Sequence, residues 1–330
     1  MRRSLAAAAA CVVVVVCAPA IAVAQAPASV GFTFEPASAS GAPTGRSYFD
    51  YSLAPGDAIQ DYVRLANLTD HDRTFFIYGA DGYTTAQGGF ALRLRDQPRT
   101  AVGAWVSLPF TTRTVPAQSA ITFPFQLGIP TDATPGDWAG GVVAVATDGT
   151  AVAPGAPASG VRIEEAVAAR IYVRVQGPLH PALAVTRLDT KLSGGTWAPF
   201  GDHGRATVTY TVANSGNVRL AGTATVELTD AFGRVAKRLE PRQMPELLPR
   251  DTTTVTESFD GLPLTGFRYH ANVLITAPGV RAAAGSAARW HVSVPATVLL
   301  LAVLVVSALG ARRVMHRHQR RERSKVLVPA

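Results

Sequence analysis

Hydrophobic and polar residues alternate with a period of two over much of the chain from Val30 onward, and this pattern predicts β-strands. The alternating segments are short and rich in β-branched and aromatic residues. They are separated by turn signals, among them Pro55-Gly56, Asp81-Gly82, Gly88-Gly89 and Pro135-Gly136. We expect strands at Ile59–Ala66, Thr74–Tyr78, Phe90–Leu94, Ala120–Leu127 and Arg170–Val175, then at Ala182–Leu188, Arg205–Ala213, Gly222–Thr229, Thr252–Ser258 and Tyr269–Ile275. Many short strands without a long amphipathic helix between them indicate antiparallel β-sandwiches.

Two strand-rich units meet at Gly177-Pro178, and they resemble each other in sequence. Val63–Asn67 matches Tyr210–Asn214, since each is a strand that ends in Ala-Asn before a polar turn. In the same way Val115–Ser119 matches Leu248–Thr252. The pattern therefore predicts an all-β fold with two tandem immunoglobulin-like β-sandwich domains, at residues 25–177 and 178–288. The first half of 161–175 also fits a helix, but the alternation that follows it favours a strand.

One segment breaks the alternation completely, because Val292–Ala311 contains no charged residue. A helix of that length covers about 30 Å, which is the thickness of a bilayer's hydrocarbon core. Residues 312–330 carry seven Arg or Lys and a single Glu, and basic flanks of this kind stay on the cytoplasmic side. We therefore expect a single transmembrane helix at 292–311 and a basic cytoplasmic tail at 312–330. A buried core helix is the alternative.

The N-terminus has the three parts of a secretory signal peptide, which are basic residues at Arg2-Arg3, an apolar run over Leu5–Val16 and a small-residue site at Ala22–Ala24. We expect residues 1–24 to be removed, although an uncleaved anchor is an alternative that the break at Pro19 disfavours. The predicted protein is a single-pass protein of the cell membrane, with an extracellular N-terminal ectodomain and a cytoplasmic C-terminus.

Cysteine content and charge limit the chemistry of the ectodomain. Both cysteines, Cys11 and Cys17, fall in the predicted signal peptide, so the exported part would have no disulfide and no thiolate. The formal charge is +8, of which Arg2 and Arg3 supply two and residues 312–330 supply six, so the segment between is neutral. A neutral ectodomain lacks the basic footprint of a nucleic-acid-binding protein, and nucleic acid is not expected as a partner.

Four segments of the first domain resemble a known family. They are similar to the peptidoglycan-binding domain of WxL-interacting proteins, once catalogued as a domain of unknown function. The four segments are Tyr48–Asp57, Tyr62–Thr69, Gly79–Thr85 and Gly136–Val142. The resemblance covers roughly residues 30–150. The family's order of signal peptide, two domains, membrane span and basic tail is also similar. The resemblance implies that the first domain contacts cell-wall peptidoglycan and that the second binds another surface or host protein.

The sequence contains no catalytic or cofactor-binding motif of the common classes, such as Gly-x-Ser-x-Gly, His-Glu-x-x-His, a P-loop or Gly-x-Gly-x-x-Gly. We therefore expect no enzyme activity, no cofactor and no metal site. Asp70-His71-Asp72 is the one compact set of residues that could hold a cation. A solvated hairpin turn is the better interpretation, because Asp and Asn favour turns through local hydrogen bonds.

Glycan binding normally uses exposed aromatic side chains, and five are candidate ligand-binding residues: Tyr48, Tyr83, Trp105, Trp138 and Trp197. Tyr83 follows the Asp81-Gly82 signal and is expected to be exposed in a turn, whereas core packing is the alternative for Trp138. Our hypothesis is a non-enzymatic, membrane-anchored surface protein that binds cell-wall peptidoglycan, with a secreted or surface protein as a further candidate partner. The alternative is a stalk or assembly subunit that binds another surface protein and no glycan.

Overall fold

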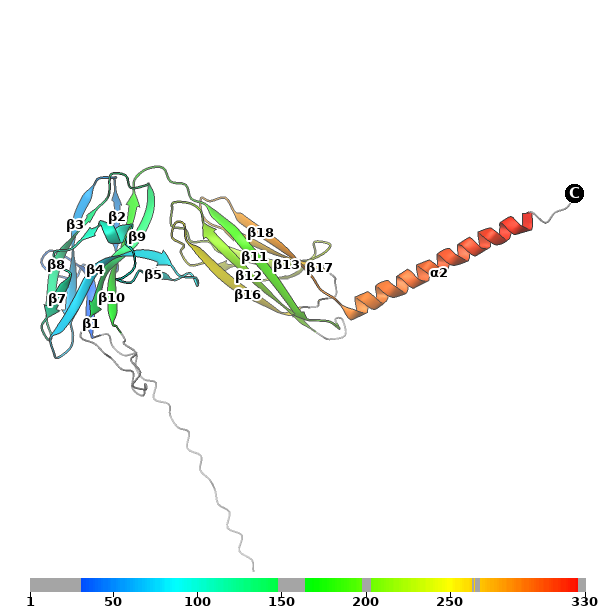
Figure 1. Cartoon of the computed structure of the whole chain (residues 1–330), viewed down its shortest axis with the longest axis horizontal. Coiled ribbons are helices and arrows are strands. Elements are labelled where there is room, and N and C mark those ends of the chain that lie inside the picture. Colours follow the sequence, from blue (N-terminus) through cyan, green and yellow to red (C-terminus); the bar gives the residue numbers. More distant parts are fainter. Residues whose placement is uncertain (1–30, 148–163, 198–202, 263, 265–267, 326–330) are drawn as a thin grey trace, which may run out of the picture.

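The computed structural model describes residues 31–147, 164–197, 203–262, 264 and 268–325, which form two β-sandwiches followed by one long helix (Figure 1). The predicted all-β fold with a C-terminal helix is confirmed. The predicted signal peptide lies outside the described residues.

The first sandwich consists of two sheets with the strand orders β1-β3-β8-β6 and β2-β10-β9-β4-β5, and β7 also pairs with β4. Its elements are β1 (Phe32–Ala37), β2 (Phe49–Leu53), β3 (Ala58–Asn67), β4 (Arg73–Thr84), β5 (Phe90–Leu92), α1 (Val102–Trp105), β6 (Val106–Ser107), β7 (Thr112–Val115), β8 (Ala120–Gly128), β9 (Gly136–Ala146) and β10 (Ala166–Val175). β2 runs parallel to β10, at the edge of its sheet. The inward-facing residues of both sheets share one core, which includes Phe34, Leu65 and Phe123 from the first and Phe75, Val142 and Ile171 from the second.

The second sandwich has the strand orders β11-β12-β16 and β14-β13-β17-β18, and β15 also pairs with β13. Its strands are β11 (Leu183–Gly194), β12 (Gly204–Asn214), β13 (Thr223–Asp230), β14 (Val235–Arg238), β15 (Arg242–Gln243), β16 (Thr252–Leu262), β17 (Arg268–Thr276) and β18 (Ala283–Trp290). In β12 the predicted alternation holds, because Val208, Tyr210 and Val212 are buried and the threonines between them are partly exposed.

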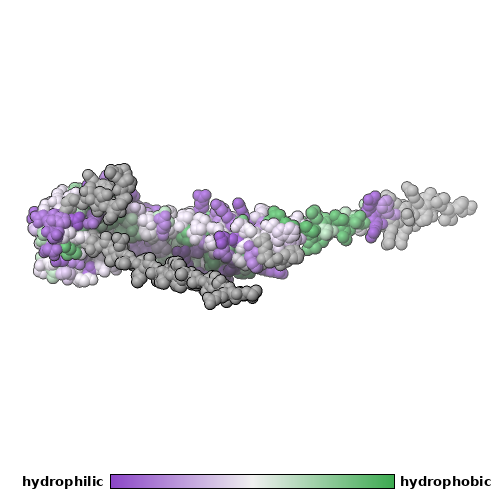
Figure 2. All heavy atoms as spheres, turned by 90° about the horizontal axis from the view of Figure 1, so that it is seen from below, coloured by the Kyte–Doolittle hydropathy of each residue, from purple (hydrophilic) through white to green (hydrophobic). Residues whose placement is uncertain are grey.

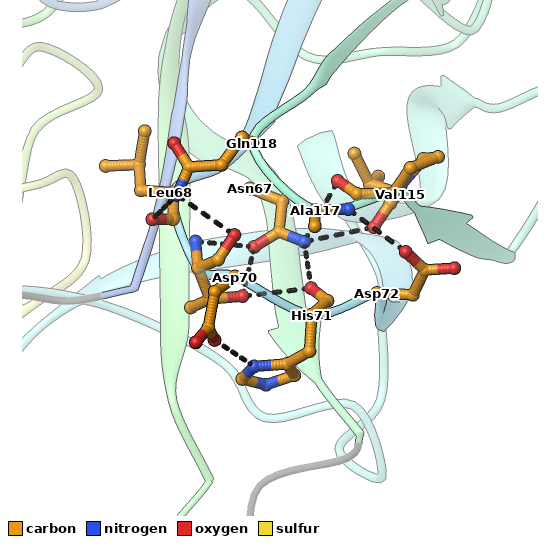
Figure 3. A network of polar contacts seen from close by, with 10 residues as sticks. Asn67, Leu68, Asp70, His71, Asp72, Val115, Ala117 and Gln118 are labelled. Carbon is orange, nitrogen blue, oxygen red and sulfur yellow. Dashed lines mark hydrogen bonds and ion pairs between the residues drawn. The ribbon is translucent and has the colours of Figure 1, made fainter.

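The Asp70-His71-Asp72 segment lies in the connection from β3 to β4, as the turn interpretation predicts (Figure 3). The connection is held by Asn67, whose side chain is buried. The Asn67 amide nitrogen lies 2.8 Å from the carbonyl oxygen of His71 and 3.1 Å from that of Val115, and its oxygen accepts a 3.0 Å bond from the Thr69 N–H. The carboxylate of Asp72 accepts a hydrogen bond from the Ala117 N–H, so the polar groups of this segment stabilise the turn itself.

Asn214 makes the same contacts in the second sandwich. Its amide nitrogen donates to the carbonyl oxygens of Val218 and Leu247, at 2.7 and 3.1 Å. The backbone N–H of Asn214 donates to the carbonyl oxygen of Asp251, just as the backbone N–H of Asn67 donates to that of Ser119. The residues directly before Ser119 and Asp251 are Gln118 and Arg250. In the part of the chain that the structure describes, these are the two non-glycine residues with positive φ. The sequence matches noted at Ala-Asn therefore correspond to one shared structural device.

The turn predicted at Asp81-Gly82 is wrong, because both residues lie inside β4. Asp81 is buried, and its carboxylate accepts 2.7 Å bonds from the N–H groups of Thr100 and Gly103, next to α1. Local turn preference is overridden because a distant segment uses this carboxylate as its acceptor. Tyr83, expected to be exposed in that turn, is a partly buried strand residue instead.

The C-terminal helix α2 (Val294–Lys325) projects from the end of the second sandwich (Figure 1). By length and composition its segment Thr297–His316 can cross a membrane, and none of that segment is buried against the rest of the protein. Pro295 falls in the first helical turn, where a missing N–H breaks no helical bond. Figure 2 shows the apolar stretch as an exposed rod that ends in a hydrophilic segment.

Candidate functional site

The two sandwiches meet at an ion cluster centred on Asp137, whose side chain is 3% exposed. Asp137 is the second residue of β9 and lies opposite Arg174 of β10. Arg174 donates from Nε to Oδ1 at 2.7 Å and from Nη2 to Oδ2 at 2.9 Å. The backbone N–H of Arg219, in the second sandwich, donates to Oδ2 at 2.8 Å. One carboxylate therefore joins two strands of the first sandwich to a loop of the second.

The electrostatics of this cluster favour the ionised carboxylate. Burial raises the pKa of Asp137, but the bonds from Arg174 and from the Arg219 N–H outweigh that effect and hold the pKa below its ordinary value. The bond to Asp137 likewise raises the pKa of Arg174. The cluster is therefore a charged joint at neutral pH.

The backbone next to Asp137 also contacts the second sandwich. Gly136 has a φ of +129°, and a Cβ there would lie 2.3 Å from the carbonyl oxygen of Asn217. The Asp137 N–H donates to the same oxygen at 2.7 Å. Glycine is required at 136 because the second domain's backbone comes this close.

A second set of contacts comes from the hairpin of β4 and β5, which reaches toward the second sandwich (Figure 1). The Thr84 N–H donates to Oδ2 of Asp251 at 2.5 Å, and the Thr84 hydroxyl accepts the Leu248 N–H at 3.1 Å. At the hairpin turn, the Ala86 carbonyl oxygen accepts the Thr254 N–H at 3.1 Å. Beneath these bonds lies a small apolar cluster of Ala139, Tyr172, Leu248 and Phe90.

Two clefts flank the joint. The junction cleft, of about 330 Å³, is lined by Asp50, Tyr51, Ser52, Asp137, Tyr172, Val173, Arg174 and Arg219. In it the Arg219 guanidinium carbon lies 4.1 Å from the ring centroid of Tyr172, so both domains form its wall. The Trp138 cleft, of about 140 Å³, also borders Asp137, and its lining includes Asp81, Arg93, Trp138, Arg250 and Asp251.

β2 forms the open side of the junction cleft. In the part of the chain that the structure describes, no strand pairs with its outer edge. The Leu53 carbonyl oxygen accepts the Gln176 N–H, so Leu53 faces β10. Because backbone groups of successive strand residues point to opposite edges, those of Ser52 and Asp50 point outward. An edge strand of this kind can accept an extended peptide.

The approach to β2 is fixed by polar contacts. Arg46 donates to both oxygens of Asp61, at 2.8 and 3.0 Å, and the Tyr51 hydroxyl donates to Asp61 Oδ2 at 2.7 Å. Burial raises the pKa of Asp61, but the bonds from Arg46, Tyr51 and the Tyr62 N–H lower it by more than that. The pKa of Asp61 is therefore below its ordinary value. β2 is therefore held in place from one side while its other edge stays open.

The structure gathers the five predicted aromatic residues only in part. Trp105 and Trp138 meet edge to face, with ring centroids 5.2 Å apart, and Arg250 lies 5.5 Å from the Trp138 ring. Tyr48 is 46% exposed and lies against Tyr172, beside the junction cleft. Tyr83 packs under Arg93. Trp197 is 56% exposed at the far end of the second sandwich, so the five do not form one surface.

Sequence reasoning missed the charged residues of the joint, Asp137, Arg174 and Arg219. Asp137 was present only as a member of a family-like segment, and Arg174 lies at an outward position of a strand, where a solvent-exposed arginine is the ordinary expectation. The usable signal was the Pro-Gly-Asp sequence at the start of a strand, since Gly136 allows the close approach described above. Among the described residues, no group of three or more His, Cys, Asp and Glu side chains is placed to hold a metal ion.

Comparisons with known proteins give a weak likeness. No protein-family model and no curated protein matches the sequence. A chain of the chaperone–tip adhesin complex of CFA/I fimbriae biogenesis is 12% identical, with a TM-score of 0.35 over 80% of this chain and 99% of that one. The class 5 fimbriae chaperone CfaA is 12% identical, with a TM-score of 0.33 over 79% and 100%. The CupB2 chaperone of Pseudomonas aeruginosa is 9% identical, with a TM-score of 0.29 over 73% and 97%. Scores this low carry no argument about function.

Proposed function

We propose that this chain is a non-enzymatic, membrane-anchored protein-interaction module, and that its partner is a surface or secreted protein that adds an extended segment to the outer edge of β2. The observation that carries the proposal is the open edge of β2, which lies directly beside a cleft built from both sandwiches. Main-chain bonds to an edge strand supply affinity, and neighbouring pockets supply specificity.

The junction cleft gives the added strand a defined environment. Its charged groups are the guanidinium groups of Arg174 and Arg219, the carboxylate of Asp137 between them, and the exposed carboxylate of Asp50. The Tyr48 ring at the start of β2 adds an exposed aromatic surface. A partner segment with alternating polar and aromatic side chains suits this combination.

The rigid joint supports a binding role, since the cleft persists only while the two sandwiches keep one relative orientation. Asp137 and the β4–β5 hairpin hold that orientation from two places. The α2 segment Thr297–His316 is the proposed anchor. The extracellular placement of the sandwiches follows from the basic tail, as the sequence predicts.

Peptidoglycan binding and membership of the WxL-interacting family stay predictions from the sequence resemblance. They require an exposed glycan-binding surface, but of the five aromatic candidates only Tyr48 and Trp197 are exposed, and these two lie at separate places. The test of the main proposal therefore includes a cell-wall arm.

The test compares Ser52→Pro with Ser52→Ala in the full chain. Proline removes an outward N–H without removing a bond to β10, whereas alanine keeps that N–H. Both variants should melt within a few degrees of wild type. Chemical cross-linking on intact cells should capture the same surface or secreted protein with wild type and Ser52→Ala, and much less of it with Ser52→Pro. Equal capture by the two variants would refute pairing at β2. Retention on purified cell walls without any captured protein would favour the glycan prediction.

A further inference from the structure

Exposed hydrophobic side chains gather where α2 leaves the second sandwich. Ten large hydrophobic side chains that precede Val294 are exposed among the described residues, and five of them lie at this end. These five define the helix-proximal end: Trp197, Phe232, Val235, Trp290 and Val292. Single exposed apolar residues are ordinary on protein surfaces, but an exposed group of them marks a contact site.

Strand register places these residues at one level. Trp290 pairs with Arg268, the neighbouring pair is Tyr269 with Arg289, and Asp230 pairs with Tyr269. The turn after Asp230 therefore extends past this level in the same direction as the end of β18. Phe232 is at the tip of that turn and is 86% exposed.

The Phe232 turn is held by local hydrogen bonds. Oδ1 of Asp230 accepts the N–H groups of Phe232 and Arg234, each at 2.9 Å, and Gly233 takes the positive φ that the turn requires. A tight, side-chain-capped turn holds the phenylalanine outward, so its exposure is a built feature of the fold.

The residues that directly follow β11 are bonded to the start of the helix. The Val294 N–H donates to the Thr196 carbonyl oxygen at 2.9 Å, and Nε2 of His291 lies 3.3 Å from the Gly195 carbonyl oxygen. Trp197 follows directly and is 56% exposed. A tryptophan far from the helix in sequence is thus placed beside the helix entry.

Basic side chains accompany the apolar ones. Arg234, Arg268 and Arg289 are exposed at this end, and the guanidinium carbon of Arg268 lies 5.4 Å from the Trp290 ring centroid. Tryptophan together with arginine is the combination found at the headgroup layer of membranes, where rings insert and guanidinium groups meet phosphates.

We propose that the helix-proximal end rests on the surface of the bilayer that α2 crosses, with Phe232, Trp197 and Trp290 in its headgroup layer. The inference rests on the proposed membrane anchoring, because the apolar span begins at Thr297, only seven residues after Trp290. The uncharged stretch itself begins at Val292, two residues after Trp290, and two extended residues cover about 7 Å. The headgroup layer is about 5–7 Å thick on each side, so residues level with Trp290 lie at that layer. The folded domain would then stand on the membrane in a fixed orientation instead of swinging on a tether.

The test uses the full chain in nanodiscs of phosphatidylcholine and phosphatidylglycerol, with Cys11 and Cys17 replaced by serine. One nitroxide label is attached in each of three variants: Phe232→Cys, Leu304→Cys in the span, and Leu94→Cys, an exposed residue of the first sandwich that serves as the matched control. Accessibility of each label to a water-soluble nickel complex and to oxygen gives its depth by power saturation.

We expect the Leu304→Cys label to lie deep, the Phe232→Cys label to be at least fivefold less accessible to nickel than the Leu94→Cys label, and its depth to correspond to the headgroups. A deep Leu304→Cys label with Phe232→Cys as accessible as Leu94→Cys would overturn the inference and leave the anchor intact. A water-accessible Leu304→Cys label would overturn the anchor itself. Spin–spin broadening at Phe232→Cys would overturn the inference in favour of a contact between two copies of the chain.

Discussion

Removal of the Asp137 carboxylate should loosen the joint between the sandwiches, and the magnitude follows from its three bonds. Asp137→Ala removes all of them, whereas Asp137→Asn keeps the size and loses the charge. Two donors approach Oδ2 and one approaches Oδ1, so a turned amide must point its NH2 group at one donor at least. Bonds to charged groups contribute about 1.5–3 kcal/mol each. Because the Arg174 side chain is 45% exposed and regains water, we expect a loss of about 2–4 kcal/mol for alanine and about 1–2 kcal/mol for asparagine.

The local readout is hydrogen exchange at the Arg219 amide, measured on the ectodomain with residues 25–291. Each tenfold change corresponds to about 1.4 kcal/mol, so exchange at Arg219 should quicken by about 30–700-fold in Asp137→Ala. Asp132→Ala is the control, since Asp132 is an exposed carboxylate nearby whose side chain has no bond to any of the described residues. Equal exchange at Arg219 in the two alanine variants would refute the role of Asp137 at the joint.

The pH dependence gives an independent check. The pKa of Asp137 is lowered in the folded state, so its contribution is complete above the unfolded value of about 3.9 and is lost as pH falls through the folded value. The stability difference between wild type and Asp137→Asn should therefore be constant from about pH 5 to 7 and shrink below about pH 4. A difference that grows on acidification would contradict the assigned bonds.

Three further predictions concern packing. Tyr210→Phe should leave the free energy of unfolding in urea unchanged or raise it by about 1 kcal/mol, because the buried Tyr210 hydroxyl has no bond partner among the described residues. A lower free energy of unfolding would contradict this. Asn67→Ala and Asn214→Ala should each cost about 2–3 kcal/mol by thermal unfolding, since buried carbonyl groups lose their donors; a loss at one site alone would refute their equivalence. Gly88→Ala should speed proteolysis of the β4–β5 hairpin, because φ is +85° there and a Cβ would lie 2.2 Å from Pro245 Cγ; an unchanged rate would refute that contact.

The strands could be predicted because their evidence is local. Alternation over Ile59–Ala66 and Arg205–Ala213 reports which side chains face a core, and the observed β3 and β12 exceed those limits by only one residue at each end. The match between Asn67 and Asn214 was visible because the same carbonyl-binding device needs the same residue. The Asp81-Gly82 turn failed for the opposite reason, since the partners of Asp81 lie about twenty residues further along the chain.

The joint could not be predicted because it depends on which outward face of a sandwich is covered by the second domain. Arg174 and Tyr172 alternate with core residues of β10, and that pattern predicts solvent for both. In the structure Tyr172 is buried under Arg219 and Leu248. Periodicity separates inward from outward positions in one domain but does not identify an outward face that a neighbouring domain covers.

The composition of this joint indicates what it does. It consists mainly of a charged cluster, bonds between side chains and backbone, and a small apolar cluster of Ala139, Tyr172, Leu248 and Phe90. Charged and directional contacts of this kind add little net stability over apolar packing, but they permit few alternative geometries. Each sandwich already has its own core, so the joint is not needed to fold either one. Its physical consequence is a fixed angle between the domains, and that angle is what keeps Arg219 over Tyr172 and the junction cleft open beside β2.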